Sequence, residues 1–351
     1  MRIGGELSAF LTRHDGASQT RYQELKQLAR SQGRVLAGTP GIVKQRTRRG
    51  TDYWVREYIR ADGRKDDQHI GTREAVSTVR LAEWRAAVEL AQALARGSSR
   101  LRLLGYQRIA REPAAVLAAL CNHGLFAGGL VLVGAHAYGV LVNDFGVMAG
   151  AYKTQDIDLA RAQPLKLGGD APLAFQRLLD DSGLHFVPVP GMPSRRPSTS
   201  FKTPGGQALA VDLLAPGRAL GETLALGELA THAQTIPLLD FLVAEAQWSV
   251  VLSPNQVVPV KVPAAERFAL HKLFSSQRRR SQRDKVRKDL DQAALLVAVL
   301  EQETPGLLAD AWRRFPATAR ESVRRGARAT LNIATEMPAE AKAFLEKLAR
   351  K

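Results

Sequence analysis

The chain contains almost none of the cysteine on which disulfide-rich or cysteine-metal proteins depend. Cys121 is the single cysteine in 351 residues, so an internal disulfide and a Cys-x-x-Cys motif are both excluded. The amino terminus, MRIGGELSAFLTRHDG, lacks the apolar core of a signal peptide, and we therefore expect a cytoplasmic protein.

Two other familiar site patterns are also missing. No Gly-x-x-x-x-Gly-Lys-Ser/Thr phosphate loop occurs, which argues against that class of nucleotide-binding protein. The histidines lack the spacing of metal ligands, and we interpret them as structural by default: His123, His136, His185, His232 and His271.

Acidic residues are scarce relative to basic ones. The sequence has 50 Lys and Arg against 34 Asp and Glu, a formal net charge of +16 that attracts polyanions such as nucleic acid. The excess is concentrated near residues 278–288, where one acid, Asp284, stands among many cations. This run is either a solvated helix face or a patch that binds a polyanion. Its predicted nucleic-acid-binding residues are Arg278, Arg279, Arg280, Arg283, Lys285 and Arg287.

Long hydrophobic runs are rare, and the longest candidate is Leu125–Val142. Its length is close to that of a membrane span, but it contains several glycines and a histidine and continues directly into Asn143-Asp144. A buried strand followed by a helix explains this composition better, and we expect no membrane partner.

Turn signals divide the chain into five expected parts. Arg49-Gly50 and Asp62-Gly63 mark hairpins in a small basic sheet, and the apolar spacing of Glu74–Ala95 predicts a helix. The aromatic residues of the sheet lie among arginines, a mixture that suits either base stacking or the covering of a small sheet. The parts are an N-terminal helical segment (1–40), a basic β-meander (41–73), a linking helix (74–112), a core (113–260) and a C-terminal helical domain (261–351).

The chemistry is expected to begin after the apolar run Leu130–Val133. That run predicts a buried strand, and Gly134 follows it at a tight turn into a helix, where small residues and backbone amides can approach a phosphate. Farther on, Asp156 and Asp158 alternate along a second predicted strand and therefore face the same side. Two carboxylates about 4 Å apart repel by about 4 kcal/mol, so such a pair usually needs a proton or a cation such as Mg²⁺.

A third acid, Asp212, follows the apolar residues Ala208–Val211 in another predicted strand. If this strand pairs with the one that carries Asp156, the three carboxylates converge. Such a site can hold two metal ions, one to activate an attacking hydroxyl and one to stabilise leaving pyrophosphate.

This order of motifs resembles the nucleotidyltransferase superfamily related to DNA polymerase beta. The matching residues are Gly134-Ala135, Thr154-Gln155-Asp156-Ile157-Asp158-Leu159 and Val211-Asp212-Leu213, within a region of about 115–300. The resemblance implies an α+β fold with a mixed sheet flanked by helices, and transfer of a nucleotidyl group from a nucleoside triphosphate with Mg²⁺ or Mn²⁺. It also implies that Asp156, Asp158 and Asp212 are catalytic metal ligands and that Gly134 contacts phosphate.

The turn departs from the family pattern, which usually has serine after the glycine. Ala135 supplies no hydroxyl, so either His136 or the backbone amides must take over that contact. With Thr154 these residues complete the nucleotide contacts expected around the turn.

The order of parts is similar, more narrowly, to bacterial abortive-infection and toxin–antitoxin nucleotidyltransferases, which carry a lysine helix and a Lys-Asp pair. The resemblance implies that Lys272 contacts nucleotide phosphates, and that Asp289, beside Lys288, orients a basic group. From the residues alone, Lys272 either meets an anion or extends its amine to solvent.

The expected function is therefore metal-dependent transfer of a nucleoside monophosphate to a hydroxyl of RNA, such as tRNA, of a protein or of a small molecule. A toxin–antitoxin or phage-defence setting, with an antitoxin as partner, fits the narrower resemblance. The alternative is a catalytically weak nucleic-acid-binding or regulatory protein on the same fold.

Overall fold

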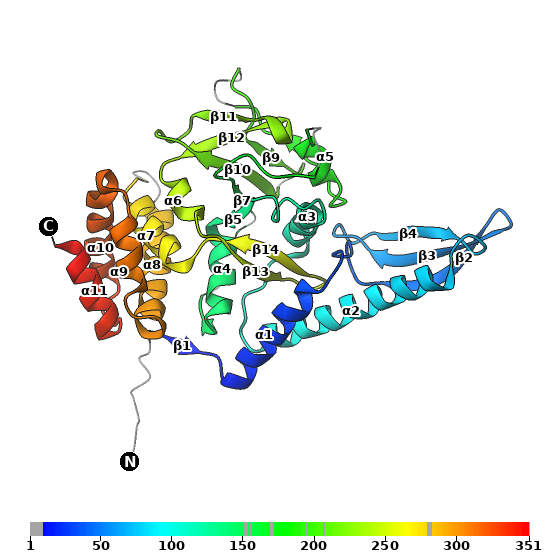
Figure 1. Cartoon of the computed structure of the whole chain (residues 1–351), viewed down its shortest axis with the longest axis horizontal. Coiled ribbons are helices and arrows are strands. Elements are labelled where there is room, and N and C mark those ends of the chain that lie inside the picture. Colours follow the sequence, from blue (N-terminus) through cyan, green and yellow to red (C-terminus); the bar gives the residue numbers. More distant parts are fainter. Residues whose placement is uncertain are drawn as a thin grey trace, which may run out of the picture.

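A central sheet lies between a projecting arm and a group of helices in the computed structural model of the chain (Figure 1). The structure describes residues 10–150, 154, 156–168, 172–191, 193, 195–205, 208–278 and 283–350. This part of the chain is a mixed α+β fold, which confirms the fold class implied by the sequence resemblance.

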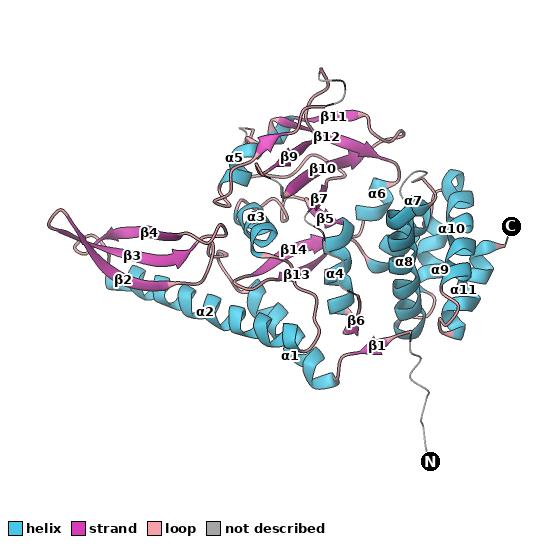
Figure 2. Cartoon of the chain, turned by 180° about the vertical axis from the view of Figure 1, so that it is seen from behind, coloured by secondary structure: helices cyan, strands magenta, loops and turns pink. Residues whose placement is uncertain are grey.

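The arm consists of two helices and the predicted β-meander. Its three strands form an antiparallel sheet in the order β2-β3-β4, which lies along helix α2 (Figures 1 and 2). Arg49 and Gly50 both adopt positive φ angles at the first hairpin turn, as a tight two-residue turn requires. The elements are α1 (Gly16–Arg30), β2 (Ile42–Arg48), β3 (Thr51–Ile59), β4 (Lys65–Thr72) and α2 (Thr78–Leu103).

Helix α2 is shifted relative to its predicted range. It begins at Thr78 because the Ser77 hydroxyl accepts a hydrogen bond from the Arg80 amide and caps the first turn. It also continues past the predicted end at Ala95, through Gly97, to Leu103. A Cβ at Gly97 would lie 2.5 Å from Cδ1 of Leu25 in α1, so this glycine allows the two helices to pack closely.

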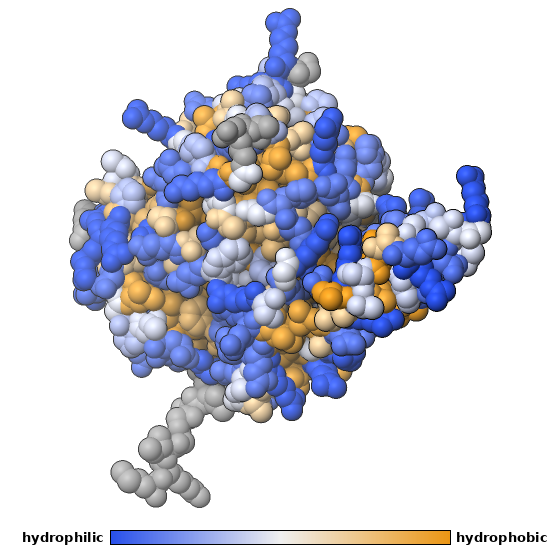
Figure 3. Space-filling view, turned by 45° about the vertical axis from the view of Figure 1, so that its right-hand side comes forward, coloured by the Kyte–Doolittle hydropathy of each residue, from blue (hydrophilic) through white to orange (hydrophobic). Residues whose placement is uncertain are grey.

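The arm is attached through its base to a two-stranded ribbon, β13 (Gln247–Leu252) and β14 (Val257–Val262). Tyr22 of α1 is buried there, and its hydroxyl donates a hydrogen bond to Asp144 over 2.8 Å. Elsewhere on the arm, Val79 and Leu103 are exposed. Figure 3 shows such hydrophobic patches between hydrophilic side chains on the face that includes the arm.

The central sheet is mixed, with the strand order β11-β12-β10-β7-β5 and with β8 and β9 joined beside β10. Strand β10 is parallel to β7 and β12, whereas β5 is antiparallel to β7 and β9 is antiparallel to β10. The strands are β5 (Val131–Val133), β7 (Asp156–Ala160), β8 (Val187–Pro188), β9 (Ser200–Lys202), β10 (Ala210–Pro216), β11 (Thr223–Leu226) and β12 (Thr231–Ile236).

The long apolar run of the sequence is a buried strand followed by a helix, as predicted. Strand β5 runs directly into α4 (Gly134–Asp144). Among the described residues, no helix is long and apolar enough to cross a membrane. Short elements around this core are α3 (Arg111–Asn122), α5 (Phe175–Asp180), η1 (Gly227–Leu229) and the pair β1 (Thr12–Arg13) and β6 (Val147–Met148).

Helices α7 to α11 form the side of the molecule opposite the arm (Figures 1 and 2). Helix α7 is almost wholly buried, packed between α8 and α10. Gly326 of α10 faces the Leu273 carbonyl, since an added Cβ would lie 2.3 Å from that oxygen. The elements are α6 (Leu239–Val243), α7 (Ala265–Ser276), α8 (Arg283–Glu303), α9 (Leu307–Arg314), η2 (Ala317–Ala319), α10 (Arg320–Ile333) and α11 (Ala339–Ala349).

Candidate active site

Two of the predicted acids are direct neighbours on parallel strands. Asp158 of β7 and Asp212 of β10 are Cα partners in the register, and their partly buried side chains line the same cavity. Asp156 lies two residues before Asp158, hence on the same face of β7, and is exposed at the start of the strand. The pairing of strands thus brings the third acid beside the Asp-x-Asp segment.

Gly134 is pressed against one of these acids. Its φ angle is +68°, a conformation in which an L side chain is strained, and an added Cβ would lie 1.9 Å from Oδ2 of Asp158. Any side chain at this position must displace the Asp158 carboxylate. The glycine is therefore needed both for the turn into α4 and for the placement of the acid.

The surroundings of Asp212 stabilise its carboxylate less well than water does. Burial is the main cause that raises the pKa of this carboxyl above its ordinary value, and the charge of Asp156 raises it further. A hydrogen bond from Ser200 is the strongest opposing influence, followed by the charges of Lys202 and Lys285. The carboxylate of Asp212 is thus an incompletely neutralised acid that gains from a nearby cation.

The acids can supply part of the donor set of a divalent metal ion. Within the described part of the chain, no group of three or more His, Cys, Asp or Glu side chains is arranged to hold a metal ion by itself. Mg²⁺, however, commonly binds through one or two carboxylates and completes its coordination with water and substrate phosphates. Asp158 and Asp212 fit this mode, with Asp156 at the open edge.

Lys272 and Asp289 form a buried ion pair next to the acids. The Lys272 Nζ lies 2.6 Å from Oδ1 of Asp289, and the Ser275 hydroxyl donates to Oδ2 over 3.0 Å. Lys272 is 9% exposed and Asp289 is 2% exposed, so the lysine does not extend its amine into solvent. The basic group that Asp289 orients is therefore Lys272, which also lines the cavity.

The cavity has a volume of about 560 Å³ and is lined by charged, polar and apolar side chains. Two of its aromatic side chains lie against its cations, since Lys272 is 5.2 Å from the ring of Phe268 and Arg278 is 5.6 Å from the ring of Phe274. The main lining residues are Gly134, Asp158, Asp212, Leu214, Leu220, Gln234, Ile236, Leu242, Phe268, Lys272, Phe274, Arg278 and Lys285.

The remaining residues predicted around the turn lie elsewhere. Ala135, His136 and Thr154 line a second cavity of about 300 Å³ rather than the first. His136 is 5% exposed, and burial lowers its pKa to about 4, with a further contribution from the charge of Lys288. The charge of Lys288 thus acts on His136, beside the second cavity.

The basic run is divided in the structure. Arg278 lines the first cavity and stacks over Phe274 at 5.6 Å, and Lys285 lines the same cavity. Arg287 pairs with Asp291 one turn along α8, and Arg283 is exposed. Arg279 and Arg280 lie outside the described residues, so their predicted contacts with nucleic acid stay predictions.

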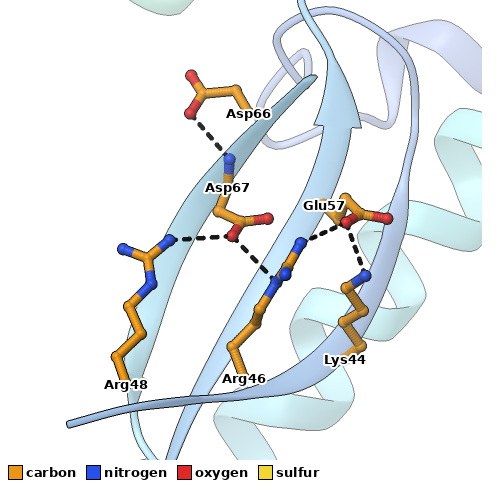
Figure 4. Close-up of polar contacts among 6 residues, drawn as sticks. All are labelled: Lys44, Arg46, Arg48, Glu57, Asp66 and Asp67. Atoms are coloured by element: carbon orange, nitrogen blue, oxygen red, sulfur yellow. Dashed lines mark hydrogen bonds and ion pairs between the residues drawn. The ribbon is translucent and has the colours of Figure 1, made fainter.

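The cations of the β-meander are largely matched by acids. Lys44 and Arg46 each approach Glu57 to 2.6 Å, and Arg46 and Arg48 each approach Asp67 to 3.2 Å (Figure 4). The aromatic residues are also engaged, with Tyr58 under Arg56 and Trp54 under Arg85 of α2. These contacts favour the interpretation in which the aromatic residues cover a small sheet.

Three residues of the site were not predicted from sequence patterns. Ser275 binds Asp289, Gln234 lines the cavity, and Ser200 donates to Asp212 from strand β9. Alternation over Ser200–Lys202 is a weak strand signal, but only the antiparallel pairing of Ser200 with Asp212 reveals its role.

Comparison with known proteins gives one match. The sequence model of a family described as Nucleotidyltransferase matches residues 111–317, more than half of the chain. The match runs from the start of α3 through the sheet and into the C-terminal helices. No curated protein and no solved structure matches this chain.

Proposed function

Because this chain belongs to the nucleotidyltransferase family, whose members transfer nucleotidyl groups, we propose that it moves a nucleoside monophosphate from a nucleoside triphosphate to an acceptor hydroxyl. The acceptor that best suits the net charge of +16 is RNA, with tRNA as the first candidate and a protein or small molecule as alternatives. The observation that carries the proposal is the pairing of Asp158 and Asp212 in the cavity that Lys272 also lines.

A divalent cation, Mg²⁺ or Mn²⁺, would be held by Asp158 and Asp212, with Asp156 as a third ligand. When bound, it would polarise the phosphoryl oxygens and neutralise charge on leaving pyrophosphate. The negative charge of Asp156 acts on Asp212 and raises its pKa. This repulsion supports the assignment, because a bound cation would reduce it.

The protein groups divide the remaining work. Lys272, held in place by Asp289, offers a fixed positive charge to the triphosphate, and Arg278 and Lys285 add two more in the same cavity. The apolar side chains of the lining and Gln234 suit a nucleoside base. In this proposal the triphosphate lies beside the acids.

The reaction is an in-line displacement at the α-phosphorus. The acceptor oxygen forms a bond to that phosphorus, the bond to the β-bridging oxygen breaks, and pyrophosphate leaves with the electron pair. Asp212 would accept the hydroxyl proton.

We extend the proposal to the division of the chain and its setting. The core at 113–260 and the helical part at 261–351 would form the catalytic unit, because Lys272 and Asp289 come from the latter. The meander at 41–73, between the helical parts 1–40 and 74–112, would be an accessory arm. A toxin–antitoxin or phage-defence role, with an antitoxin as partner, follows from the narrower sequence resemblance.

The proposal is tested by transfer of label from each α-³²P nucleoside triphosphate, with Mg²⁺ or Mn²⁺, to total tRNA and to lysate protein. Wild type is compared with Asp158→Asn, which keeps the size of the side chain but removes its charge. We expect label on an acceptor with wild type and a loss of about 1,000-fold or more in the variant, as for loss of a major electrostatic contact in a transition state.

Melting temperatures of the two proteins serve as the control for folding. If Asp158→Asn still transfers label, Asp158 is not a ligand of a metal ion that the reaction needs. No label with any nucleotide in a folded wild type would favour the alternative, a nucleic-acid-binding or regulatory protein on this fold.

A further inference from the structure

The second cavity lies on the other side of the Gly134 turn from the proposed nucleotide site. Gly134 lines the first cavity, whereas Ala135 and His136, the next residues of α4, line the second. Thr154 lines the second cavity, and two and four residues later Asp156 and Asp158 lead along β7 to the first. The Gly134 turn and the start of β7 therefore connect the second cavity to the first.

His136 presents an unused polar atom to this second cavity. The residue is 5% exposed, and its Nε2 has no hydrogen-bond partner among the described residues. His136, Gly139 and Asn143 occupy positions i, i+3 and i+7 of α4, and this helix face lines the cavity. A buried polar atom without a partner is costly, so a ligand that hydrogen-bonds to it would be stabilised.

Arg108 adds a fixed positive charge to the wall. The backbone before it is held by Asn143, which accepts from the Gln107 amide at 2.8 Å and donates to the Gln107 carbonyl at 2.9 Å. The backbone after it is held by the Ile109 amide, which donates to the Leu252 carbonyl. These bonds anchor the backbone on both sides of Arg108, at the wall of the cavity.

The charge of Arg108 is not neutralised within the described part of the chain. Its pKa is lowered by burial and then by the neighbouring charges of Arg102 and Arg111, and none of the three forms an ion pair there. Three guanidinium groups thus repel one another beside a cavity. An anion placed among them would relieve this repulsion.

Backbone dipoles point to the same kind of ligand. Helix α4 begins after Val133 and helix α3 begins after Ala110, and neither has a side-chain cap on its first turn. Ala110 and the first turn of α4 both line the second cavity. Helix N-termini attract anions, which adds to the charge of Arg108 and the donor capacity of His136.

From this convergence we propose that the second cavity binds a phosphate group of the acceptor, so that an RNA acceptor reaches the acids from the side of α4 opposite the nucleotide. This inference rests on the proposed function. The first cavity already supplies Lys272, Arg278 and Lys285 for the triphosphate, and Arg108 provides a separate positive centre for a second anionic substrate.

The test measures binding of two probes to the full chain. One is a fluorescein-labelled oligoribonucleotide of about 12 nucleotides, and the other is a fluorescent ATP analogue with Mg²⁺. Arg108→Ala removes the charge, and Gly139→Leu fills the cavity from the helix face that lines it. Gly139→Ala is the smaller step at the same position, because its Cβ would make only an ordinary 3.6 Å contact with Gln107.

We expect Arg108→Ala and Gly139→Leu to weaken oligoribonucleotide binding about tenfold, the effect of losing one charge-assisted hydrogen bond. Arg108→Ala should also reduce the slope of log affinity against log salt by about one. Binding of the ATP analogue should stay within about twofold, because that probe is expected in the first cavity. Gly139→Ala should weaken oligoribonucleotide binding less than Gly139→Leu does.

Three outcomes would overturn the inference. Unchanged oligoribonucleotide binding in Arg108→Ala would show that the second cavity is not the acceptor site. An equal loss of binding for both probes would instead assign the cavity to the nucleotide. Failure of folded wild type to bind the oligoribonucleotide would reject it as well. Because binding is read without turnover, failure of the transfer assay is a separate result that concerns the proposed function.

Discussion

At the scale of single residues, the close contact between Gly134 and Asp158 should have the largest effect on activity. Gly134→Ala would place a Cβ where the Asp158 carboxylate now lies and would strain a residue whose φ is +68°. We expect loss of label transfer of about 100-fold or more, because a displaced catalytic group loses its positioning advantage. The measurement is the rate of transfer to the acceptor identified with wild type.

Gly124→Ala is the matched control for this prediction. Gly124 also has a positive φ, +73°, but nothing lies within 4 Å of an added Cβ. Both variants should lose about 1 kcal/mol of stability from backbone strain, and only Gly134→Ala should lose activity. Equal activity in the two variants would show that the contact with Asp158 does not matter.

The burial of His136 predicts how the free energy of unfolding changes with pH. Its folded pKa, about 4, lies below the ordinary value of 6.5, so the unfolded chain takes up a proton that the folded chain excludes. The stability associated with neutral His136 is complete above pH 6.5 and is lost as pH falls toward 4. Between pH 7 and pH 5 wild type should therefore lose about 2 kcal/mol more than His136→Gln.

Urea unfolding at the two pH values measures this difference. All other titrating groups are shared by the two proteins, so their contributions cancel in the comparison. Identical pH dependence in wild type and His136→Gln would mean that His136 is not buried in its neutral form.

At the scale of elements, the packing of α10 on α7 supports the lysine that faces the nucleotide. A Cβ on Gly326 would lie 2.3 Å from the Leu273 carbonyl, next to Lys272 in α7. Gly326→Ala should therefore destabilise the protein by about 1–3 kcal/mol, as overpacking does, and raise the KM for nucleotide. Thermal unfolding and the KM of the transfer reaction provide the measurements.

Gly139→Ala provides the comparison in another helix. Gly139 has room for a Cβ, so alanine there should leave stability unchanged or raise it by up to about 1 kcal/mol through helix propensity. If Gly326→Ala is as stable as Gly139→Ala, α10 does not pack against α7 as closely as the structure shows.

At the scale of the whole molecule, the question is which surface meets the polyanion. The meander's Lys44, Arg46 and Arg48 are paired with acids, so their combined replacement by glutamine should change oligoribonucleotide affinity by less than about twofold. Fluorescence anisotropy measures this. Arg108→Ala is the positive comparison, and a larger loss in the meander variant would assign RNA binding to the arm.

The sequence predicted the individual residues of the proposed site better than it predicted which of them line the same cavity. The alternation of Asp156 and Asp158, the acid after the apolar strand at Asp212 and the glycine turn at Gly134 all depend on local pattern, which is visible in one dimension. The limits of α2 were missed because Gly97 is a close contact with Leu25 rather than a helix end. A contact between distant helices leaves no local signal.

By itself, the sequence determined the meander and the strand positions of the three acids, because strand alternation, turn glycines and apolar periodicity are properties of neighbouring residues. The α+β class followed from the order of the motifs through the family resemblance. Only the tertiary structure decided that Ala135, His136 and Thr154 face a different cavity from Gly134, and that Asp289 holds Lys272. Both depend on which face of a helix or strand meets another element, and that choice is made by packing between segments far apart in the chain.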